Sequence, residues 1–348
     1  MSNKQSGLGS LFDSVFVRLA LAGILVWGGL TAVAVYQTRY QQGVWDWQPE
    51  LQSVNYPRVL AANDQPSPDY RQQQVLAWKQ RVANHPLPQL TARAWLIKDL
   101  NLDYEIASFH PDVPFPPAST TKLMTAWVAA KHYQWNQSLQ VPRQQWIGSQ
   151  MGLKPGETIE VSNLLYGLLL TSGNDAAEVL AYHYPGGRQA FVKRMNYWAK
   201  KWDLGSTYFQ NPSGLDEPGH YSSARDLAVI AQKVLVHPLL KSIVATTEAE
   251  IFPQQTGERH YRLSNINDLL SQVPGAYGVK TGYTQEAGEV LISSVKQADK
   301  DLLVVVMGSQ DRFDETKQLL AWAGLEIDSG QPAPPASASA DSQTPASE

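Results

Sequence analysis

The stretch Pro117-Ala-Ser-Thr-Thr-Lys-Leu-Met-Thr125 sets both the fold and the chemistry of this 348-residue chain. Two consecutive prolines, at positions 116 and 117, disfavour helix before them, and apolar residues then recur at helical spacing from Leu123 to Val128. We therefore predict a helix that begins at Ser119. Residues three positions apart share a helix face, so the amine of Lys122 can reach the hydroxyl of Ser119. A serine hydroxyl is a good nucleophile only when a neighbouring base takes its proton, and a neutral lysine is such a base.

Two further short motifs follow in the chain, Ser172-Gly-Asn174 and Lys280-Thr-Gly282. Neither S-x-x-K nor S-x-N is specific alone, because each is expected about once by chance in a chain of this length. Ser293-Ser-Val-Lys296 and Ser53-Val-Asn55 indeed repeat the two patterns, but the first lies in an apolar, strand-like run and the second precedes any nucleophile. The order of the three motifs, their surroundings and the rarer K-T-G indicate one acyl-transfer site.

Side chains of the two later motifs can complete this site. The hydroxyl of Ser172, in a loop between two predicted helices, can relay a proton to a leaving amine, and the amide of Asn174 can orient the lysine or a substrate carbonyl. Lys280 and Thr281 offer a cation and a hydroxyl that suit a carboxylate. Gly282, like Gly173, permits a close approach of the backbone because it has no side chain.

The predicted base requires an unusual environment, because a lysine accepts a proton only in its neutral form. Burial and a nearby cation such as Lys280 both disfavour the charged form, so we predict that the pKa of Lys122 is lowered. If the acid limb of the pH profile of acylation had an apparent pKa of about 10, the value of a free lysine, this prediction would be contradicted. The first backbone N–H groups of the helix are unpaired and point toward the reacting oxygen, so they can form half of an oxyanion hole.

Each assignment has a structural alternative. Lys122 can be a solvated surface lysine, and Ser119 can be a helix cap. The run Ser172-Gly-Asn-Asp175 can be an interhelical turn with a capping Asn, and Lys280-Thr-Gly-Tyr283 can be the entry to a hairpin. We expect the Trp and Tyr residues to serve packing rather than to form a platform for sugars.

Composition excludes several classes of function. The formal net charge of −4 and the scattered basic residues argue against a nucleic-acid partner. The chain has no cysteine, which excludes disulfides, thiolate metal sites and a cysteine nucleophile. The seven histidines are dispersed without an H-E-x-x-H pair, so a zinc peptidase is not expected and no histidine is assigned a catalytic role. We predict no metal and no cofactor.

The N-terminal part of the chain predicts a membrane connection. Residues 1–18 are expected to be cytoplasmic, and the uncharged run Leu19–Tyr36 is about long enough to cross a bilayer as a helix. Arg18 precedes this run and Arg39 follows it, with Lys4 further upstream, a bias that weakly favours an inside amino terminus. A cleaved signal peptide is the alternative, because Ala32-Val-Ala34 resembles an A-x-A cleavage site. Either interpretation places the rest of the chain outside the cytoplasm.

Three more segments follow the apolar run. Residues 37–88 are polar and are interpreted as a stem, in which Asp69–Asn84 could form a helix through Val75, Leu76, Trp78 and Val82. Residues 89–328 form the predicted catalytic domain. Residues 329–348 consist almost entirely of Pro, Ala, Ser and other polar residues, which cannot bury enough surface to fold.

Strand-like runs occur at both ends of the catalytic domain, with helical runs between them. The predicted strands are Ala92–Ile97, Tyr104–Phe109, Tyr277–Thr281, Val290–Val295 and Leu302–Gly308. The later predicted helices are Asn163–Leu170, Asp175–Tyr184, Arg188–Trp202, Leu227–Val236 after the capping-box-like Ser223-Ala-Arg-Asp226, and Phe313–Leu325. This order predicts an α+β fold, in which helices flank one antiparallel sheet built from both ends of the domain and form a helical subdomain.

The three motifs resemble those of the penicillin-binding protein and serine β-lactamase superfamily, and their surroundings are similar to the low-molecular-mass D-alanyl-D-alanine carboxypeptidases. The resemblance covers about Leu90 to Leu325 and includes Met151-Gly-Leu-Lys-Pro-Gly-Glu157, Asn211-Pro-Ser-Gly-Leu-Asp216 and His220-Tyr-Ser-Ser-Ala-Arg-Asp-Leu-Ala228. It implies a β-lactamase/transpeptidase-like fold. It also implies cleavage of the terminal D-Ala from a peptidoglycan stem peptide through an acyl-serine at Ser119, and covalent binding of β-lactam inhibitors.

The resemblance assigns further roles. The oxyanion hole would use the backbone N–H groups of Ser119 and Tyr283, and Arg312, matched by its spacing to Leu319-Leu-Ala-Trp322, would help to hold the substrate carboxylate. Many members have a β-rich second domain and a C-terminal amphipathic anchor, whereas here the catalytic region runs into the polar tail. Glu289 places a charge beside the strand that follows the Lys280 motif, for which the sequence offers no explanation.

Other activities of the same residues stay open. An endopeptidase that cleaves peptidoglycan cross-links would use the same motifs, and a catalytically silent wall-binding protein could retain the fold. A class A β-lactamase needs a glutamate that activates the deacylating water, but the corresponding stretch reads Tyr208-Phe-Gln-Asn211. We therefore expect slow release of penicillin rather than fast hydrolysis.

Overall fold

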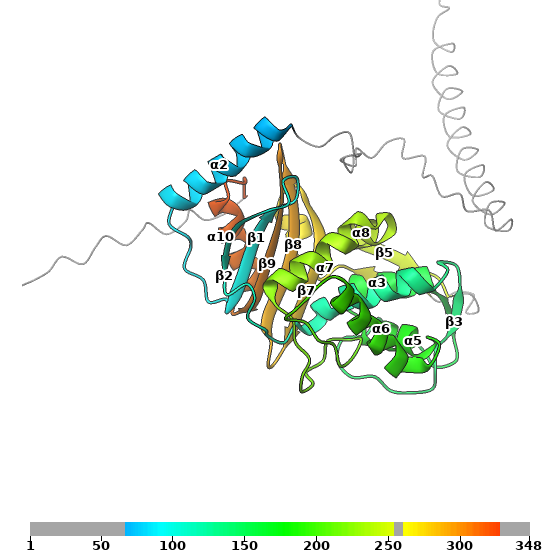
Figure 1. Cartoon of the computed structure of the whole chain (residues 1–348). Coiled ribbons are helices and arrows are strands. Elements are labelled where there is room, and N and C mark those ends of the chain that lie inside the picture. Colours follow the sequence, from blue (N-terminus) through cyan, green and yellow to red (C-terminus); the bar gives the residue numbers. More distant parts are fainter. Residues whose placement is uncertain (1–66, 254–259, 328–348) are drawn as a thin grey trace, which may run out of the picture. The chain divides into compact units, whose positions relative to one another are not determined.

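The computed structural model describes residues 67–253 and 260–327, and its centre is a five-stranded antiparallel sheet in the order β2-β1-β9-β8-β7 (Figure 1). Its strands are β1 (Ala94–Asp99), β2 (Tyr104–Phe109), β7 (Ala276–Thr284), β8 (Gly288–Gln297) and β9 (Lys300–Ser309). β1 pairs with β9, so the first and last parts of the domain meet in the middle of the sheet. The predicted α+β fold is thus confirmed, with all five strands near their predicted positions.

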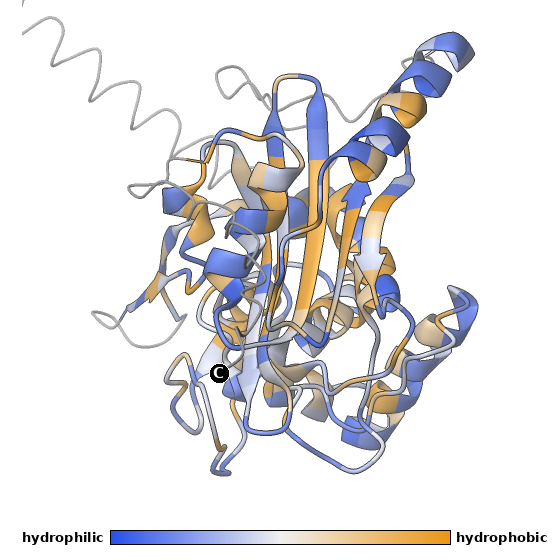
Figure 2. Cartoon of the chain, turned by 90° about the vertical axis from the view of Figure 1, so that its left-hand side faces the viewer, coloured by the Kyte–Doolittle hydropathy of each residue, from blue (hydrophilic) through white to orange (hydrophobic). Residues whose placement is uncertain are grey.

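Both faces of this sheet are buried. Alternate residues along β9 point to opposite sides: Leu303, Val305 and Met307 pack into one core cluster, and Leu302, Val304 and Val306 pack into the other. Figure 2 shows the long central strands as hydrophobic over most of their length. A sheet with two apolar faces needs helices on both sides, and the domain therefore has three layers.

One outer layer is formed by α2 (Pro68–Asn84) and α10 (Arg312–Trp322), with the short α9 (Leu269–Gln272) beside them in the same core cluster. Ser67 caps α2, and the side chain of Trp78 packs into the core and donates from Nε1 to Asp99 Oδ2 at 3.0 Å. The helix expected at Asp69–Asn84 therefore exists. Although it lies in the range interpreted as a stem, it packs against the catalytic domain.

The other layer carries the helical part of the domain. Its helices are α3 (Lys122–His132), α4 (Val161–Leu169), α5 (Asn174–Tyr182), α6 (Gly187–Lys201), α7 (Ala224–Val236) and α8 (Pro238–Ala245). Two small antiparallel hairpins, which the sequence did not predict, complete the fold: β3 (Ser138–Gln140) with β4 (Thr158–Glu160), and β5 (Glu248–Ile251) with β6 (Tyr261–Ser264).

The starts of α3 and α7 differ most from prediction. A 3₁₀ turn over Ala118–Thr121 precedes α3, so the α-helix begins at Lys122 and not at Ser119. At α7, Ser223 Oγ accepts the N–H of Asp226 as predicted, but the Asp226 carboxylate accepts from Ser206 N and Thr207 Oγ1 and is not part of a reciprocal capping box.

Several predictions concern residues outside the described part of the chain: residues 1–18, expected to be cytoplasmic, the apolar run 19–36, most of the range 37–88 interpreted as a stem, and the tail 329–348. Within residues 67–253 and 260–327, no single helix has the length and apolar composition needed to cross a bilayer. α7 and α8 meet these criteria only as a pair, and they are bent by 105° relative to each other.

Candidate active site

The nucleophile stands on the 3₁₀ turn at the start of α3. A 3₁₀ helix has three residues per turn, so side chains at i and i+3 lie directly above one another. This geometry brings Lys122 Nζ to 2.9 Å from Ser119 Oγ. Thr120 Oγ1 donates to Pro117 O at 2.6 Å and holds the turn closed. The predicted pair is thus confirmed, although its helix type differs.

Lys122 is fully buried, and three oxygen atoms surround its amine. Besides Ser119 Oγ, these are Asn174 Oδ1 at 2.7 Å and the carbonyl oxygen of Ser213 at 2.5 Å. Burial lowers the pKa of Lys122 well below its ordinary value, and the positive charge of Lys280 lowers it further. Both predicted causes are present, with burial the larger.

The hydrogen bonds of Lys122 define what its neutral form can do. A neutral amine has two N–H groups and one lone pair. The carbonyl oxygens of Asn174 and Ser213 can only accept, so they take the two N–H groups. The lone pair then faces Ser119 Oγ, whose hydroxyl donates to it. The site therefore holds the base in the orientation that removes the proton from the nucleophile.

Asn174 is fixed in turn by the loop that faces it. Its Nδ2 donates to Ile147 O at 2.7 Å, which turns Oδ1 toward Lys122, and its backbone N donates to Ser149 O at 2.7 Å. The neighbouring Asp175 is fully buried. Its carboxylate accepts the backbone N–H groups of Met151, Gly152 and Leu153 in this loop at 2.9 to 3.0 Å. The start of α5 thus positions both the amide and the loop.

Lys280 and Thr281 approach from the edge strand β7. Lys280 is 1% exposed, and burial together with the charge of Arg312 lowers the pKa of Lys280 to about 7. Its Nζ donates to Thr281 O at 3.0 Å. The hydroxyl of Thr281 is buried and has no hydrogen-bond partner among the described residues, which leaves it available to a ligand.

Two glycines allow the strands and loops to approach the nucleophile closely. A Cβ atom at Gly282 would lie 2.9 Å from Ser119 N, so the strand and the turn are in backbone contact. Gly214, with a φ of +85°, lies against the carbonyl of Ala118, where a Cβ would overlap the oxygen. Both sides of the turn are therefore fixed by residues that lack a side chain.

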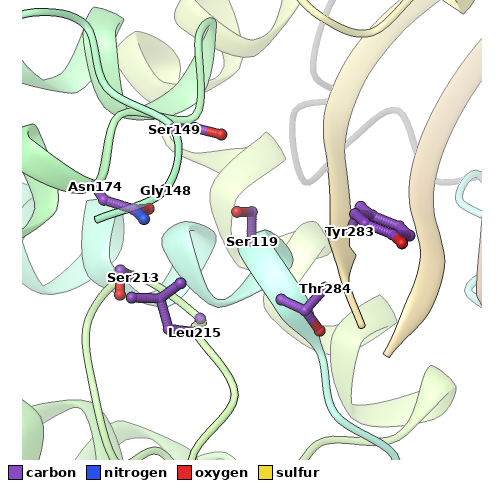
Figure 3. Close-up of a pocket in the computed structure, with 9 residues that line it drawn as sticks. Ser119, Gly148, Ser149, Asn174, Ser213, Leu215, Tyr283 and Thr284 are labelled. Atoms are coloured by element: carbon purple, nitrogen blue, oxygen red, sulfur yellow. The ribbon is translucent and has the colours of Figure 1, made fainter. Parts of the chain in front are cut away.

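Around Ser119 lies a small cavity (Figure 3). In the figure, Ser119 stands between Asn174 and Ser149 on one side and Tyr283 and Thr284 on the other. The complete lining is Ser119, Gly148, Ser149, Asn174, Ser213, Gly214, Leu215, Tyr283 and Thr284. Within the described residues this lining includes no carboxylate. Thr284 Oγ1 donates to Asp216 Oδ1 at 2.6 Å and ties β7 to the loop of Ser213.

Of the predicted site residues, Ser119, Asn174 and Tyr283 line the cavity; the lining does not include Lys122, Ser172, Lys280, Thr281, Gly282 or Arg312. Ser172 is 2% exposed, adopts a left-handed φ of +60°, and its Oγ has no hydrogen-bond partner in the described part of the chain. It precedes Asn174 by two residues but does not line the cavity. Arg312 begins α10 and forms an ion pair with Glu289, at 3.3 Å from Nη1 to Oε1. Glu289, unexplained from the sequence, is thus the counter-charge of Arg312.

The sequence motifs missed one contact of the base. Ser213 acts through its backbone carbonyl, and the Asn211 side chain holds that loop by accepting the N–H groups of Ser213 and Gly214 at 3.2 and 2.7 Å. The sequence signal for this loop is the run Asn211–Asp216, which resembles the family pattern but predicts no contact with Lys122. The second S-x-x-K serine, Ser293, lies fully buried within β8 and does not line the cavity.

No group of three or more His, Cys, Asp or Glu side chains in the described ranges could hold a metal ion. The side chains gathered at the site supply a hydroxyl, two amines and an amide. Such a set suits acyl transfer through a covalent serine intermediate.

Comparison with known proteins agrees with this chemistry. A family model described as D-alanyl-D-alanine carboxypeptidase matches residues 79–311. The D-alanyl-D-alanine carboxypeptidase DacB2 of Mycobacterium tuberculosis is 35% identical over 247 residues, which cover 68% of this chain and 84% of that protein. DacC of Escherichia coli is 35% identical over 252 residues, and the chain spans 62% of its length.

Solved structures show the same likeness. A D-alanyl-D-alanine carboxypeptidase from Mycobacterium tuberculosis has a TM-score of 0.66 and 32% identity, covering 70% of this chain and 94% of that one. Penicillin binding protein 6B from Escherichia coli has a TM-score of 0.62 and 31% identity, covering 69% of this chain and 79% of that one. With the serine–lysine pair, the family model and these relatives in agreement, the chain belongs to the D-alanyl-D-alanine carboxypeptidase family of serine peptidases, with the fold of the penicillin-binding proteins.

Proposed function

We propose that Ser119 attacks the carbonyl carbon between the last two D-alanines of a peptidoglycan stem peptide, and that Lys122 is the base for both halves of the reaction. The observation that carries this proposal is the hydrogen-bond set of Lys122, whose amine lies 2.9 Å from Ser119 Oγ and gives its two N–H groups to carbonyl oxygens. A base in reach of its proton, with a lowered pKa, is what serine activation needs.

In the acylation step, the proton of the Ser119 hydroxyl passes to Lys122 Nζ as Oγ bonds to the carbonyl carbon. The negative charge on the carbonyl oxygen faces the N–H groups of Ser119 and Tyr283. The bond to the leaving D-Ala nitrogen then breaks, and that nitrogen receives the proton from Lys122. The buried, unpaired hydroxyl of Ser172 supports a role as relay on this path.

In the deacylation step, water enters where D-Ala left. Lys122, neutral again, accepts a proton from this water as its oxygen attacks the ester carbon. Ser119 leaves as the alcohol and recovers the proton from Lys122. The lining offers no carboxylate as an alternative base, which supports slow release of a bound β-lactam.

Substrate recognition is assigned to β7 and the cations behind it. As the edge strand of the main sheet, β7 offers backbone groups on its outer side to an extended peptide. In this proposal, Lys280, Thr281 and Arg312 supply two cations and a hydroxyl, which suit the carboxylate that marks the end of a peptide. A peptidase that removes only the last residue must recognise this group.

We also propose that the domain works outside the cytoplasm at the cell membrane, held there through the apolar run Leu19–Tyr36. The support comes from sequence: the run is uncharged and about as long as a bilayer-spanning helix requires. Sequencing the amino terminus of the mature protein tests this. A start at Val35 would indicate a cleaved leader instead.

Labelling with a fluorescent penicillin tests the catalytic assignment. We expect covalent labelling of the wild-type protein and complete loss in Ser119→Ala. The matched control is Ser293→Ala, which removes the serine of the second S-x-x-K and should label as wild type. Absence of a covalent adduct on the peptide that bears Ser119 would refute the proposal.

Two assays separate the remaining activities. Digestion of purified muropeptides distinguishes a carboxypeptidase, which releases free D-Ala from pentapeptides, from an endopeptidase, which converts dimers to monomers. Nitrocefin distinguishes both from a β-lactamase. The lining has no carboxylate to activate a deacylating water, so we expect slow release, and rapid multiple turnover would contradict this expectation.

A further inference from the structure

Glu289 holds Arg312 at two points. Glu289 Oε1 lies 3.3 Å from Arg312 Nη1, and Glu289 Oε2 accepts the backbone N–H of Arg312 at 2.9 Å. One carboxylate therefore binds both the side chain and the main chain of the same residue. The two side chains are 30% and 16% exposed, so solvent screens this pair less than a surface ion pair.

The sheet aims Glu289 at this position. Glu289 lies on β8 opposite Tyr283 of β7 and opposite Ser309 of β9, and the register of β8 with β9 shifts between Glu289 and Val290. Such a bulge redirects a side chain and is often found next to active sites. Here the carboxylate meets the first residue of α10, where the unpaired N–H groups of a helix favour an anion.

Arg312 needs a fixed partner because it is close to another cation. Its charge contributes to the lowered pKa of Lys280, which is fully buried. Like charges repel, and a long arginine side chain without an anionic contact would turn toward solvent. Arg312 Nε is buried and has no partner among the described residues, so the guanidinium retains donor capacity beyond the bond to Glu289.

We propose that Glu289 is a positioning residue, which clamps Arg312 beside Lys280 so that the remaining guanidinium donors meet the terminal carboxylate of the substrate. This inference rests on the proposed function, in which Arg312 binds that carboxylate. It gives the unexplained charge of Glu289 a role in selecting peptides with a free C-terminus.

The test compares two substrates on the full chain: a diacetyl-lysyl-D-alanyl-D-alanine peptide as the free acid and as its C-terminal amide. The ratio of kcat/KM between acid and amide measures recognition of the carboxylate. We expect Glu289→Gln to lower this ratio roughly tenfold, the size of a charge-assisted hydrogen bond, through a higher KM for the acid. The kcat/KM for the amide should stay unchanged, which a general structural defect would not allow.

Three further variants complete the test. Glu286→Gln, an exposed acid-to-amide change in the same β7–β8 turn, should keep the wild-type ratio. Arg312→Ala should bring the ratio close to one, and Glu289→Gln added to it should have no further effect. Glu289→Asp keeps the charge and should give an intermediate ratio, which covers the case in which Glu289→Gln does not fold.

The outcomes separate the two hypotheses. If Arg312→Ala retains the discrimination, the assignment of Arg312 fails, whatever Glu289 does. If Arg312→Ala abolishes it but Glu289→Gln leaves it at the wild-type value, the positioning role is wrong. If Glu289→Gln raises the ratio, Glu289 competes with the substrate for Arg312, and the proposal is overturned.

Discussion

Gly282 of β7 is in backbone contact with the nucleophile, because a Cβ atom built on Gly282 would lie 2.9 Å from Ser119 N and 3.0 Å from Ala118 Cβ. Neither neighbour is the end of a flexible side chain that could move away. The spacing between the edge strand and the 3₁₀ turn therefore depends on the absence of one methyl group. This spacing also sets the distance between the two backbone N–H groups of the proposed oxyanion hole.

Gly282→Ala should separate β7 from the turn and impair the chemistry. A displacement of a few tenths of an ångström to about 1 Å at a reacting group can lower a rate roughly 100-fold, and we expect this order of loss in acylation by a fluorescent penicillin. The control is Gly205→Ala, where a Cβ would meet no atom within 4 Å. Acylation of Gly282→Ala at the wild-type rate would show that the contact is not restrictive.

Asn174→Asp should move the acid limb of the acylation rate to higher pH. The new carboxylate would stand about where Oδ1 is now, 2.7 Å from Lys122 Nζ, and an adjacent negative charge raises the pKa of a lysine. We expect a shift of at least about one pH unit and a loss of roughly tenfold or more at pH 7.

The matched variant for that experiment is Asn174→Ala. It removes the same hydrogen bond without adding a charge, so it should lower the rate while leaving the acid limb well below that of Asn174→Asp. Identical pH profiles of the two variants would mean that a charge at position 174 does not control the pKa of Lys122.

Lys280→Met should stabilise the fold while it removes one of the two cations assigned to the substrate carboxylate. The pKa of Lys280 is lowered to about 7 in the folded protein, so the unfolded chain binds more protons between that pH and the ordinary lysine value. Burial of Lys280 therefore costs most below pH 7, and this cost fades as the pH rises toward about 10. We expect Lys280→Met to raise the free energy of unfolding by roughly 1–4 kcal/mol at pH 6.

Urea unfolding at pH 6 and at pH 10 measures this effect. The gain should be largest at the lower pH and small at the higher one. Lys79→Met on the exposed part of α2 is the control and should give little gain at either pH. If the gain in the free energy of unfolding of Lys280→Met does not change with pH, the lowered pKa of Lys280 is contradicted.

Trp78→Ala tests whether α2 belongs to the folded domain. Trp78 is 6% exposed and bonds to the buried Asp99, so its loss leaves a cavity and removes one donor from a carboxylate. We expect a loss of about 3–5 kcal/mol in the free energy of unfolding. Acylation under native conditions should change little, since Trp78 and the nucleophile lie in different layers of the domain. Leu76→Ala, at an exposed position of the same helix, should stay within about 0.5 kcal/mol of wild type.

Sequence patterns predicted those parts of the site that act through side chains in short motifs. Lys122 Nζ lies within hydrogen-bond distance of both Ser119 Oγ and Asn174 Oδ1, which agrees with the spacing and order of the motifs. The strands β8 and β9 were also predicted from sequence, because both of their faces are buried and their sequences are therefore nearly continuous apolar runs.

The remaining features depend on contacts that sequence does not display. The third hydrogen bond of Lys122 goes to the backbone carbonyl of Ser213. Every residue has such a carbonyl, so the residue type does not reveal this contact. Glu289 and Arg312 are brought together only when β8, β9 and α10 have packed. The 3₁₀ turn before α3 joins residues three apart by hydrogen bonds, whereas an α-helix joins residues four apart, and the two share the same sequence pattern. The small hairpins have only three or four residues per strand, too few to show a periodic pattern.

In the proposed mechanism, Lys122 accepts a proton in each half-reaction and must release it before the next one begins. A departing D-alanine diffuses away with its proton and makes room for water beside the amine. The amine released from a β-lactam ring stays tethered to the acyl group, where it can crowd out the water and slow the second half-reaction. In this mechanism, slow release of the antibiotic follows from the use of Lys122 in both half-reactions.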